Sequence, residues 1–458
     1  MGRFHKFIAD KHFYQQVITV AIPLMLQQLV TSSLNLVDNL MIGQLGDAAL
    51  GGVATSNRFF MVALFALIGI LSASAVFIAQ YFGAKDQENM KQTFRFSIVT
   101  SVLVTLVFFT IAYFNPLAVL TFFTDDPMIL AEGTKYITIA AFSILPFALT
   151  GSIASAMRAV GETKIPLYVG IFAVSVNVVL NYALIFGHFG FPAMGITGAA
   201  IATVTSRVIE AMILLVIMKH RVFHFSTRLV DLFLISAKNI KKISLKALPL
   251  TTNEILWSFG MATLFKFYAT RGPEVIAGIS IASTTADLFF VLFGGMSVAT
   301  TIMISQPLGA NQLDVAKKHG YQMLGFSTML AVIFGMAMFG ASFFVPLLYN
   351  VSDASQHIAA TMLRIMSVMF WIYMGTAECY FILRAGGDMK STLMMDAGFM
   401  WVINIPVVGL VAYLTQFNIF VLYLVGQSTD FIKLAFAYRL VKKEKWINNL
   451  TIDEIIDL

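Results

Sequence analysis

A single carboxylate interrupts a long stretch of uncharged residues near the start of the chain. Asp38 lies in SSLNLVDNLMIG, and Asn35, three residues earlier, shares its face if the stretch is helical. Asn177 and Asn181 are four residues apart in NVVLNYALIFG and share a helical face in the same way. A carboxylate beside amides can be held neutral or ionised, so it can exchange a proton or Na⁺. We predict that these four residues form a coupling-ion site; the alternative is that Asp38 only hydrogen-bonds an adjacent helix.

A second set of charged side chains lies in the second half of the chain. Glu254 follows Pro249 in LPLTTNEILWSFG, and we predict that it contacts a coupling ion or a substrate, with capping or packing as the alternative. Lys266 and Asp287 lie at about the same depth on either side of one loop, which makes them candidates for an ion pair of structural or functional value. Three further acids lie close to the ends of apolar stretches and are interpreted as structural: Glu378, Asp396 and Asp430.

The composition explains why these charges are informative. Of the 458 residues, 58% are hydrophobic and 12% are charged, whereas soluble domains carry about a quarter charged residues. Apolar runs long enough to cross a hydrocarbon core of roughly 30 Å as helices recur along the chain, without the alternation of a membrane β-barrel. The basic residues lie in short loops, so the net charge of +6 does not indicate nucleic-acid binding. The sequence therefore predicts a helical protein of the lipid bilayer.

Motifs of enzymes, nucleotide sites and cofactor sites are absent from the sequence. GGDMKST is similar to a phosphate loop, but Met389 stands where the glycine before the lysine must be. Neither H-E-x-x-H nor G-x-S-x-G occurs, and the single cysteine, Cys379, excludes internal disulfides and cysteine-cluster metal sites. We therefore expect no enzyme activity, no cofactor, and no metal site beyond Na⁺ at Asp38 or Glu254. A gradient of H⁺ or Na⁺ is the expected energy source.

Hydropathy, together with Gly, Pro and charge punctuation, predicts twelve membrane-spanning helices. Pro23 lies inside the first of them, where we expect a kink or a tilt. The predicted spans are 15–44, 53–82, 94–114, 134–157, 166–187 and 195–218 in the first half, and 244–270, 279–308, 320–348, 358–383, 392–414 and 418–438 in the second.

The chain contains two copies of one six-span unit. Shifting the sequence by 226 residues without a gap aligns Pro23 with Pro249, QYFGA with QPLGA, and RAVGETK with RAGGDMK. Because six is an even number, both copies enter the membrane from the same side and are related by an axis along the membrane normal. The predicted fold is an all-α integral membrane protein with two parallel six-helix repeats around a central cleft. The predicted divisions are an N-terminal lobe at 1–218, a basic cytoplasmic linker at 219–243, a C-terminal lobe at 244–440 and a cytoplasmic tail at 441–458.

The duplicated loop motif is the strongest motif in the chain. Its glycines permit tight turns, and an arginine with an acid three or four residues later can join a loop to a helix end. We interpret both loops as structural elements of gating rather than as binding sites. Their named residues are Arg158, Gly161 and Glu162 in the first copy, and Arg384, Gly387 and Asp388 in the second.

Lysine and arginine in the short loops predict the orientation in the membrane. The linker, the duplicated loops and both termini are basic, whereas the opposite loops include the acidic TDDPMILAEG. Because basic loops stay in the cytoplasm, both termini are expected to be cytoplasmic. We predict a multi-pass protein of the plasma (cytoplasmic) membrane, which is the inner membrane in cells with two membranes. We expect it to act as a monomer.

Together these features resemble the multidrug and toxic compound extrusion (MATE) family of secondary antiporters, over essentially the whole chain. The residues that carry the resemblance are IPLMLQQLVTSSLNLVDNLMIGQLG, QYFGAKD, AMRAVGETKIPL, NVVLNYALIFG, LPLTTNEILWSFGM and ILRAGGDMKS. The resemblance implies rocking, alternating access, and export of small organic cations or other amphipathic compounds in exchange for H⁺ or Na⁺. It also implies that Asp38 carries the coupling cation, with Asn177 and Asn181 as its polar partners and Glu254 as the acid of the second lobe.

Two departures from the family pattern leave the coupling ion open. Asn181 stands where some members have an aspartate, and FWIYMG stands where others have an acid in the tenth span, with Glu378 further along. A flippase for lipid-linked precursors is the alternative function, and it should have a more cationic cavity. A channel ranks lower because it needs neither duplicated halves nor asymmetric embedded acids, and an intramembrane enzyme ranks lowest.

Overall fold

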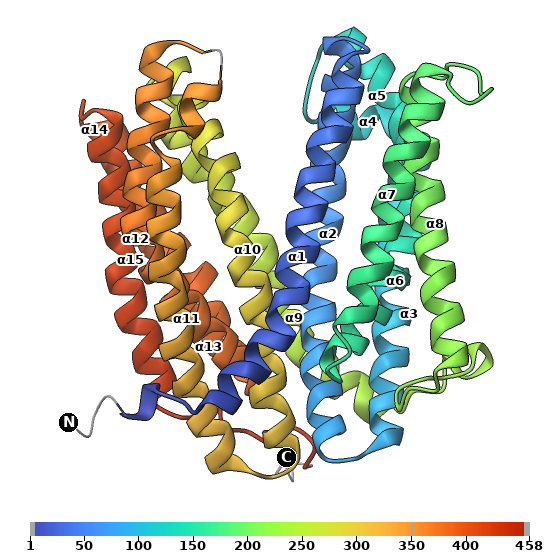
Figure 1. The fold of residues 1–458 in the computed structure, drawn as a ribbon, viewed down its shortest axis with the longest axis vertical. Coiled ribbons are helices and arrows are strands. Elements are labelled where there is room, and N and C mark those ends of the chain that lie inside the picture. Colours follow the sequence, from blue (N-terminus) through green and yellow to red (C-terminus); the bar gives the residue numbers. More distant parts are fainter. Residues whose placement is uncertain (1–4, 350, 453–458) are drawn as a thin grey trace. The chain divides into compact units, whose positions relative to one another are not determined.

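The computed structural model shows a helical protein (Figure 1). It describes residues 5–349 and 351–452, apart from the side chains at residues 5, 34–36, 229 and 273. These residues form α-helices joined by short 3-10 and π-helical segments, and no strand occurs among them. The all-α fold class predicted from the sequence is therefore confirmed.

The helices follow the predicted repeat. In the first half they are α1 (Lys11–Gly43), α2 (Asp47–Gly83), α3 (Gln87–Phe114), α4 (Pro116–Thr121), α5 (Pro127–Ala140), α6 (Ile144–Ala159), α7 (Lys164–Phe186) and α8 (Ile196–His220). In the second half they are α9 (Ala237–Ala269), α10 (Pro273–Gly309), α11 (Leu313–Ala341), α12 (Asp353–Ala385), α13 (Met389–Leu393), α14 (Ile405–Leu414) and α15 (Ile419–Lys442). Between α13 and α14 the chain is π-helical over Met394–Gly398 and Met400–Asn404.

Eleven helical stretches in the described part are long and apolar enough to cross a membrane. One of them joins α5 to α6, and another joins α13 to α14 through the π-helical segments. The twelfth predicted span corresponds to α9, which is 33 residues long, about 50 Å at 1.5 Å per residue. It is not counted among these apolar stretches because its centre carries the polar residues Thr251, Thr252, Asn253 and Glu254. The same polar residues that lower the hydropathy of α9 make this helix a candidate for a functional role.

The chain folds into two compact units. The N unit contains residues 26–78 and 86–251, and the C unit contains residues 1–25, 79–85 and 252–458. α1 passes from one unit to the other between Met25 and Leu26, two residues after Pro23. A proline inside a helix removes one backbone hydrogen bond, so the transition lies where the helix is weakest. The lobe and linker boundaries given above stay a prediction.

The QYFGA and QPLGA motifs of the repeat meet inside the C unit. A Cβ built on Gly83 would lie 1.9 Å from the Gln306 carbonyl oxygen, and a Cβ built on Gly309 would lie 1.8 Å from the Gln80 carbonyl oxygen. Each glycine therefore allows its helix, α2 or α10, to approach the backbone of the other. The pairing is reciprocal because Gln80 aligns with Gln306 and Gly83 with Gly309 in the repeat.

Replacing Gly309 by alanine should destabilise the C unit by about 1–3 kcal/mol, the usual cost of overpacking. The added methyl group would meet a backbone carbonyl oxygen, which cannot rotate away as a side chain would. Thermal unfolding of the purified protein in detergent would measure the change. Gly294→Ala is the matched control, because that glycine is also on α10 and a Cβ there has nothing within 4 Å. Equal melting temperatures for the two variants would contradict the prediction.

The residues that follow α15 fold back onto the C unit. The side chain of Trp446 is fully buried, and the Leu450 amide donates to Gln80 Oε1 over 2.7 Å. Gln80 Nε2 in turn donates to the Asn448 carbonyl oxygen over 3.3 Å. The duplicated glutamine at position 80 therefore also holds the C-terminal segment.

Candidate ion-coupling sites

The structure brings Asp38, Asn177 and Asn181 together in the N unit. Asn181 Nδ2 on α7 donates to Asp38 Oδ1 on α1 over 2.8 Å. The side-chain amide of Asn177 can hydrogen-bond to its neighbours only when its nitrogen points toward Asp38. In this orientation the nitrogen donates to Asp38 Oδ2 over 2.8 Å and to Asp38 Oδ1 over 3.3 Å. Both asparagines are more than nine-tenths buried. The side chain of Asn35 lies outside the described residues, so its part in this cluster stays a prediction.

Asp38 is held by amides alone. Among the ion pairs of the described residues none includes Asp38, and Arg207 on α8 of the same unit pairs with Glu210 over 2.7 Å. The buried Asn181 Oδ1 has no hydrogen-bond partner in the described part of the chain. An unsatisfied buried acceptor costs about 1–3 kcal/mol. The cluster thus presents a carboxylate that forms no close ion pair among the described residues, although Arg207 acts on it electrostatically, next to a free amide oxygen. Both groups suit a proton or a hard monovalent cation.

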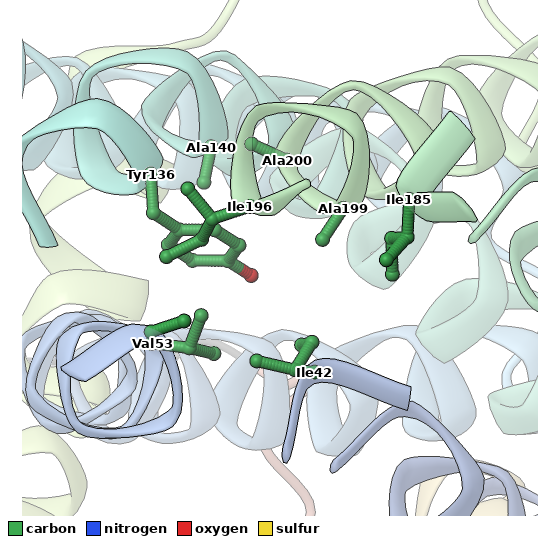
Figure 2. Packing of buried hydrophobic residues seen from close by; sticks show 9 residues of the cluster. Ile42, Val53, Tyr136, Ala140, Ile185, Ile196, Ala199 and Ala200 are labelled. Atoms are coloured by element: carbon green, nitrogen blue, oxygen red, sulfur yellow. The ribbon is translucent and has the colours of Figure 1, made fainter. Parts of the chain in front are cut away.

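An apolar cluster lies one helical turn beyond this polar cluster. Ile42 follows Asp38 by four residues, Ile185 follows Asn181 by four residues, and both are buried. Figure 2 shows Ile42 and Val53 facing Tyr136, Ala199 and Ile185 across the helices. Apolar packing of this kind excludes water. It therefore limits access to Asp38 from that end of α1 and α7.

Glu254 belongs to a hydrogen-bonded network in the C unit. Tyr380 Oη on α12 donates to Glu254 Oε1 over 3.1 Å. Asn253 Nδ2 lies 3.5 Å from Tyr380 Oη and donates to Asp396 Oδ2 over 3.0 Å. Asp396 is in the π-helical segment Met394–Gly398, and its Oδ1 accepts from Lys433 Nζ on α15 over 2.7 Å. We call Glu254, Tyr380, Asn253, Asp396 and Lys433 the C-unit network.

Glu378 and Arg384 are buried beside this network. Glu378 is fully buried, and Thr300 Oγ1 on α10 donates to its Oε1 over 2.5 Å. Arg384 Nη2 donates to Ser297 Oγ over 2.6 Å, and its guanidinium lies 5.4 Å from the ring centre of Tyr380. Glu378 is therefore an interior group of the C unit, and its position near the end of the predicted span stays a prediction.

The predicted pair of Lys266 and Asp287 does not form. No ion pair joins these two described residues within 4.0 Å, and both are exposed. The depth argument placed them at one level of the membrane but said nothing of the direction in which each side chain points. Both side chains point away from the packed faces of their helices, α10 and α9. No contact in the part of the chain that the structure describes therefore supports the roles proposed for them, and only their exposure is consistent with those roles.

The two duplicated loops share their backbone but not their side-chain contacts. Gly161 and Gly387 have φ values of +94° and +85°, which glycine adopts without strain. Asp388 caps α13 by accepting from the Ser391 amide over 3.1 Å. The corresponding helix, α7, has no side-chain cap at its start, so Glu162 does not repeat this role. Arg384 binds Ser297, as described above, and the gating role of Arg158 stays a prediction.

Sequence reasoning did not identify Lys433, Asn253 and Tyr380 as members of one site. One signal was available for Lys433, which is a charged residue within the predicted span 418–438, three residues after Asp430. Asn253 is next to Glu254, but the sequence does not say that it faces Asp396. Asp396 itself was interpreted as structural, and its contacts with Asn253 and Lys433 place it inside the polar network.

The repeated helices and the buried polar groups inside them define an integral membrane transporter with two homologous halves. The MatE family model matches the chain twice, over residues 23–183 and 249–410, at the same offset as the repeat. The chain therefore belongs to the MATE family.

Relatives agree with this assignment. A probable multidrug resistance protein NorM of Bacillus cereus is 24% identical over 407 residues, which is 88% of this chain and 89% of that protein. Among solved structures, a mutant of the Vibrio cholerae MATE transporter VcmN has a TM-score of 0.86 at 19% identity, covering 95% of this chain and 98% of that one. A MATE protein solved in a bent conformation has a TM-score of 0.85 at 17% identity and covers 98% of each chain. At these identities the structural likeness shows the fold alone.

Proposed function

We propose that this protein is a secondary antiporter that exports small organic cations or other amphipathic compounds in exchange for H⁺ or Na⁺. The two halves would expose a central site alternately to either side of the membrane, as the parallel repeat suggests. The basic loops favour a plasma-membrane protein with both termini in the cytoplasm. The similarity to NorM, which is described as a multidrug resistance protein, supports a drug-like cargo.

The observation that carries this proposal is Asp38 and its two asparagines. A charged group inside a membrane span costs about 2.5–3.5 kcal/mol on insertion scales, so its retention calls for a role. Here the carboxylate has two amide donors and no basic partner among the described residues. Binding of H⁺ or Na⁺ would neutralise it and would favour the conformation in which the site is closed to water. Glu254 in the C unit is proposed as a second ion or substrate contact.

The experiment is a flux measurement with the purified protein in liposomes. A fluorescent organic cation is followed under an imposed pH gradient, and then under a Na⁺ gradient, with the other ion equal on both sides. Under one of these ion gradients, we expect the organic cation to move in the direction opposite to the driving ion. We expect no net movement when neither ion gradient is imposed. Rapid equilibration without any gradient would favour a channel. If no cation moves under either gradient, a lipid-linked substrate labelled in one leaflet tests the flippase alternative.

A further inference from the structure

Lys433 forms a close ion pair with Asp396 in the C unit. Its Nζ lies 2.7 Å from Asp396 Oδ1, and the two side chains are 13% and 18% exposed. Asp430, three residues earlier on α15, lies on the same helical side and is partly buried. An ammonium group is a compact positive charge with three donors, so in this position it does what a bound monovalent cation would do.

The remaining groups around Asp396 are already matched. Asp396 Oδ2 accepts from Asn253 Nδ2 over 3.0 Å, and Asn253 Oδ1 accepts from the Ala397 amide over 3.1 Å. Asn253 is fully buried, and these two bonds fix its orientation. Glu254 accepts from Tyr380 over 3.1 Å. Within the described residues no three His, Cys, Asp or Glu side chains are arranged to hold a metal ion.

The N unit shows the contrasting arrangement. Among the described residues Asp38 accepts only from amides and forms no ion pair within 4.0 Å, although Arg207 acts on it electrostatically, whereas Asp396 has a lysine at ion-pairing distance. The repeat does not duplicate either arrangement. Asp38 aligns with Leu264, and Lys433 aligns with Arg207, which forms its ion pair with Glu210. One half therefore presents a carboxylate that forms no close ion pair among the described residues, and in the other half Asp396 is paired with Lys433.

We propose that Lys433 is a tethered cation that excludes Na⁺ from the carboxylates of Asp396 and Asp430, and is thereby a specificity-determining residue of the transporter. The inference rests on the proposed function, since it concerns which ion the second half admits. With Lys433 in place, Asp396 has a counter-ion built into the protein, so Na⁺ finds no unpaired carboxylate at this position. Without the ammonium, the two carboxylates would become an oxygen-rich site for a monovalent cation.

The test measures Na⁺ binding rather than transport, so it stands apart from the proposed function. Every protein carries Asp38→Asn, which removes the candidate site of the N unit. Thermal unfolding in detergent is recorded in NaCl and in choline chloride at equal ionic strength. For Asp38→Asn alone we expect no Na⁺ effect that depends on Asp396. Adding Lys433→Gln should lower the melting temperature in choline, and Na⁺ should raise it again by a few degrees in a concentration-dependent way, because a ligand of the folded state stabilises it.

Two controls separate a bound ion from a general effect. Lys433→Arg keeps the positive charge and should leave the melting temperature independent of Na⁺. Asp396→Asn added to Lys433→Gln removes the carboxylate and should abolish the Na⁺ response. If Asp38→Asn/Lys433→Gln unfolds at one temperature in both salts, the proposal is wrong.

A variant with Lys433→Gln that does not fold would still leave a decisive measurement. Asp38→Asn alone must then show no Na⁺ response that adding Asp396→Asn removes. A rise in its melting temperature with Na⁺ that disappears on adding Asp396→Asn would overturn the proposal, because Na⁺ would be binding beside Lys433. Failure of the proposed function would appear elsewhere, as an absence of gradient-driven flux in the wild-type protein.

Discussion

Asp38→Asn should reduce gradient-driven transport by about tenfold or more while leaving the protein folded. The substitution keeps the shape of the side chain but removes the charge to which Asn177 and Asn181 donate. Hydrogen bonds to a charged group are worth about 1.5–3 kcal/mol each, and 1.4 kcal/mol corresponds to a factor of ten. We therefore expect ion-coupled flux to fall by about tenfold or more. The measurement is cation flux in liposomes under the gradient that drives the wild-type protein.

The control for this variant is Asp47→Asn, the same substitution at the exposed start of α2. It should transport like the wild-type protein. Unfolding temperatures must be compared as well, because a loss of flux in a poorly folded variant would carry no information. Transport by Asp38→Asn at the wild-type rate would exclude Asp38 as the coupling group and would move attention to Glu254.

Much of the first cluster was predictable from the sequence. Asn177 and Asn181 are one helical turn apart, and Asp38 is the only acid of its span, so periodicity and scarcity together indicated a shared site. The repeat fixed the number of spans and their parallel relation without any structural information. These features depend on local spacing, which a sequence carries directly.

The network of the C unit was not predictable in the same way. Which face of α15 packs toward the π-helical segment decides whether Lys433 meets Asp396, and no local pattern reports it. The same gap explains the pair of Lys266 and Asp287, which share a depth but not a direction. The π-helical turns between Met394 and Asn404 shift the register of the side chains that follow. Contacts between helices that are far apart in the sequence could therefore not be predicted before the fold was known.

The asymmetry of the two units suggests a division of labour on one duplicated scaffold. In the proposed mechanism, binding of H⁺ or Na⁺ in the N unit would change the charge of the site, because Asp38 forms no ion pair among the described residues. In the C unit, Lys433 already balances Asp396, and the network joins α9, α12 and α15 through side-chain hydrogen bonds. The second unit would then respond mainly through Glu254, whose oxygen is bound by a neutral phenol.

The ion pair of Lys433 and Asp396 leads to the second prediction with a large effect. Asp396→Asn would leave the ammonium mostly buried without its closest partner, and breaking a buried pair costs about 3–5 kcal/mol. We expect a marked fall in the melting temperature, and substantial recovery when Lys433→Gln is added, since the double variant buries no unpaired charge. Lys317→Gln and Glu444→Gln are the control, because that pair is equally close at 2.8 Å but its side chains are 42% and 35% exposed. An exposed pair is worth about 0–1 kcal/mol. If both pairs gave equally small losses, or if the double variant were no more stable than Asp396→Asn, the buried ammonium would not depend on Asp396, and its role as a tethered cation would lose its basis.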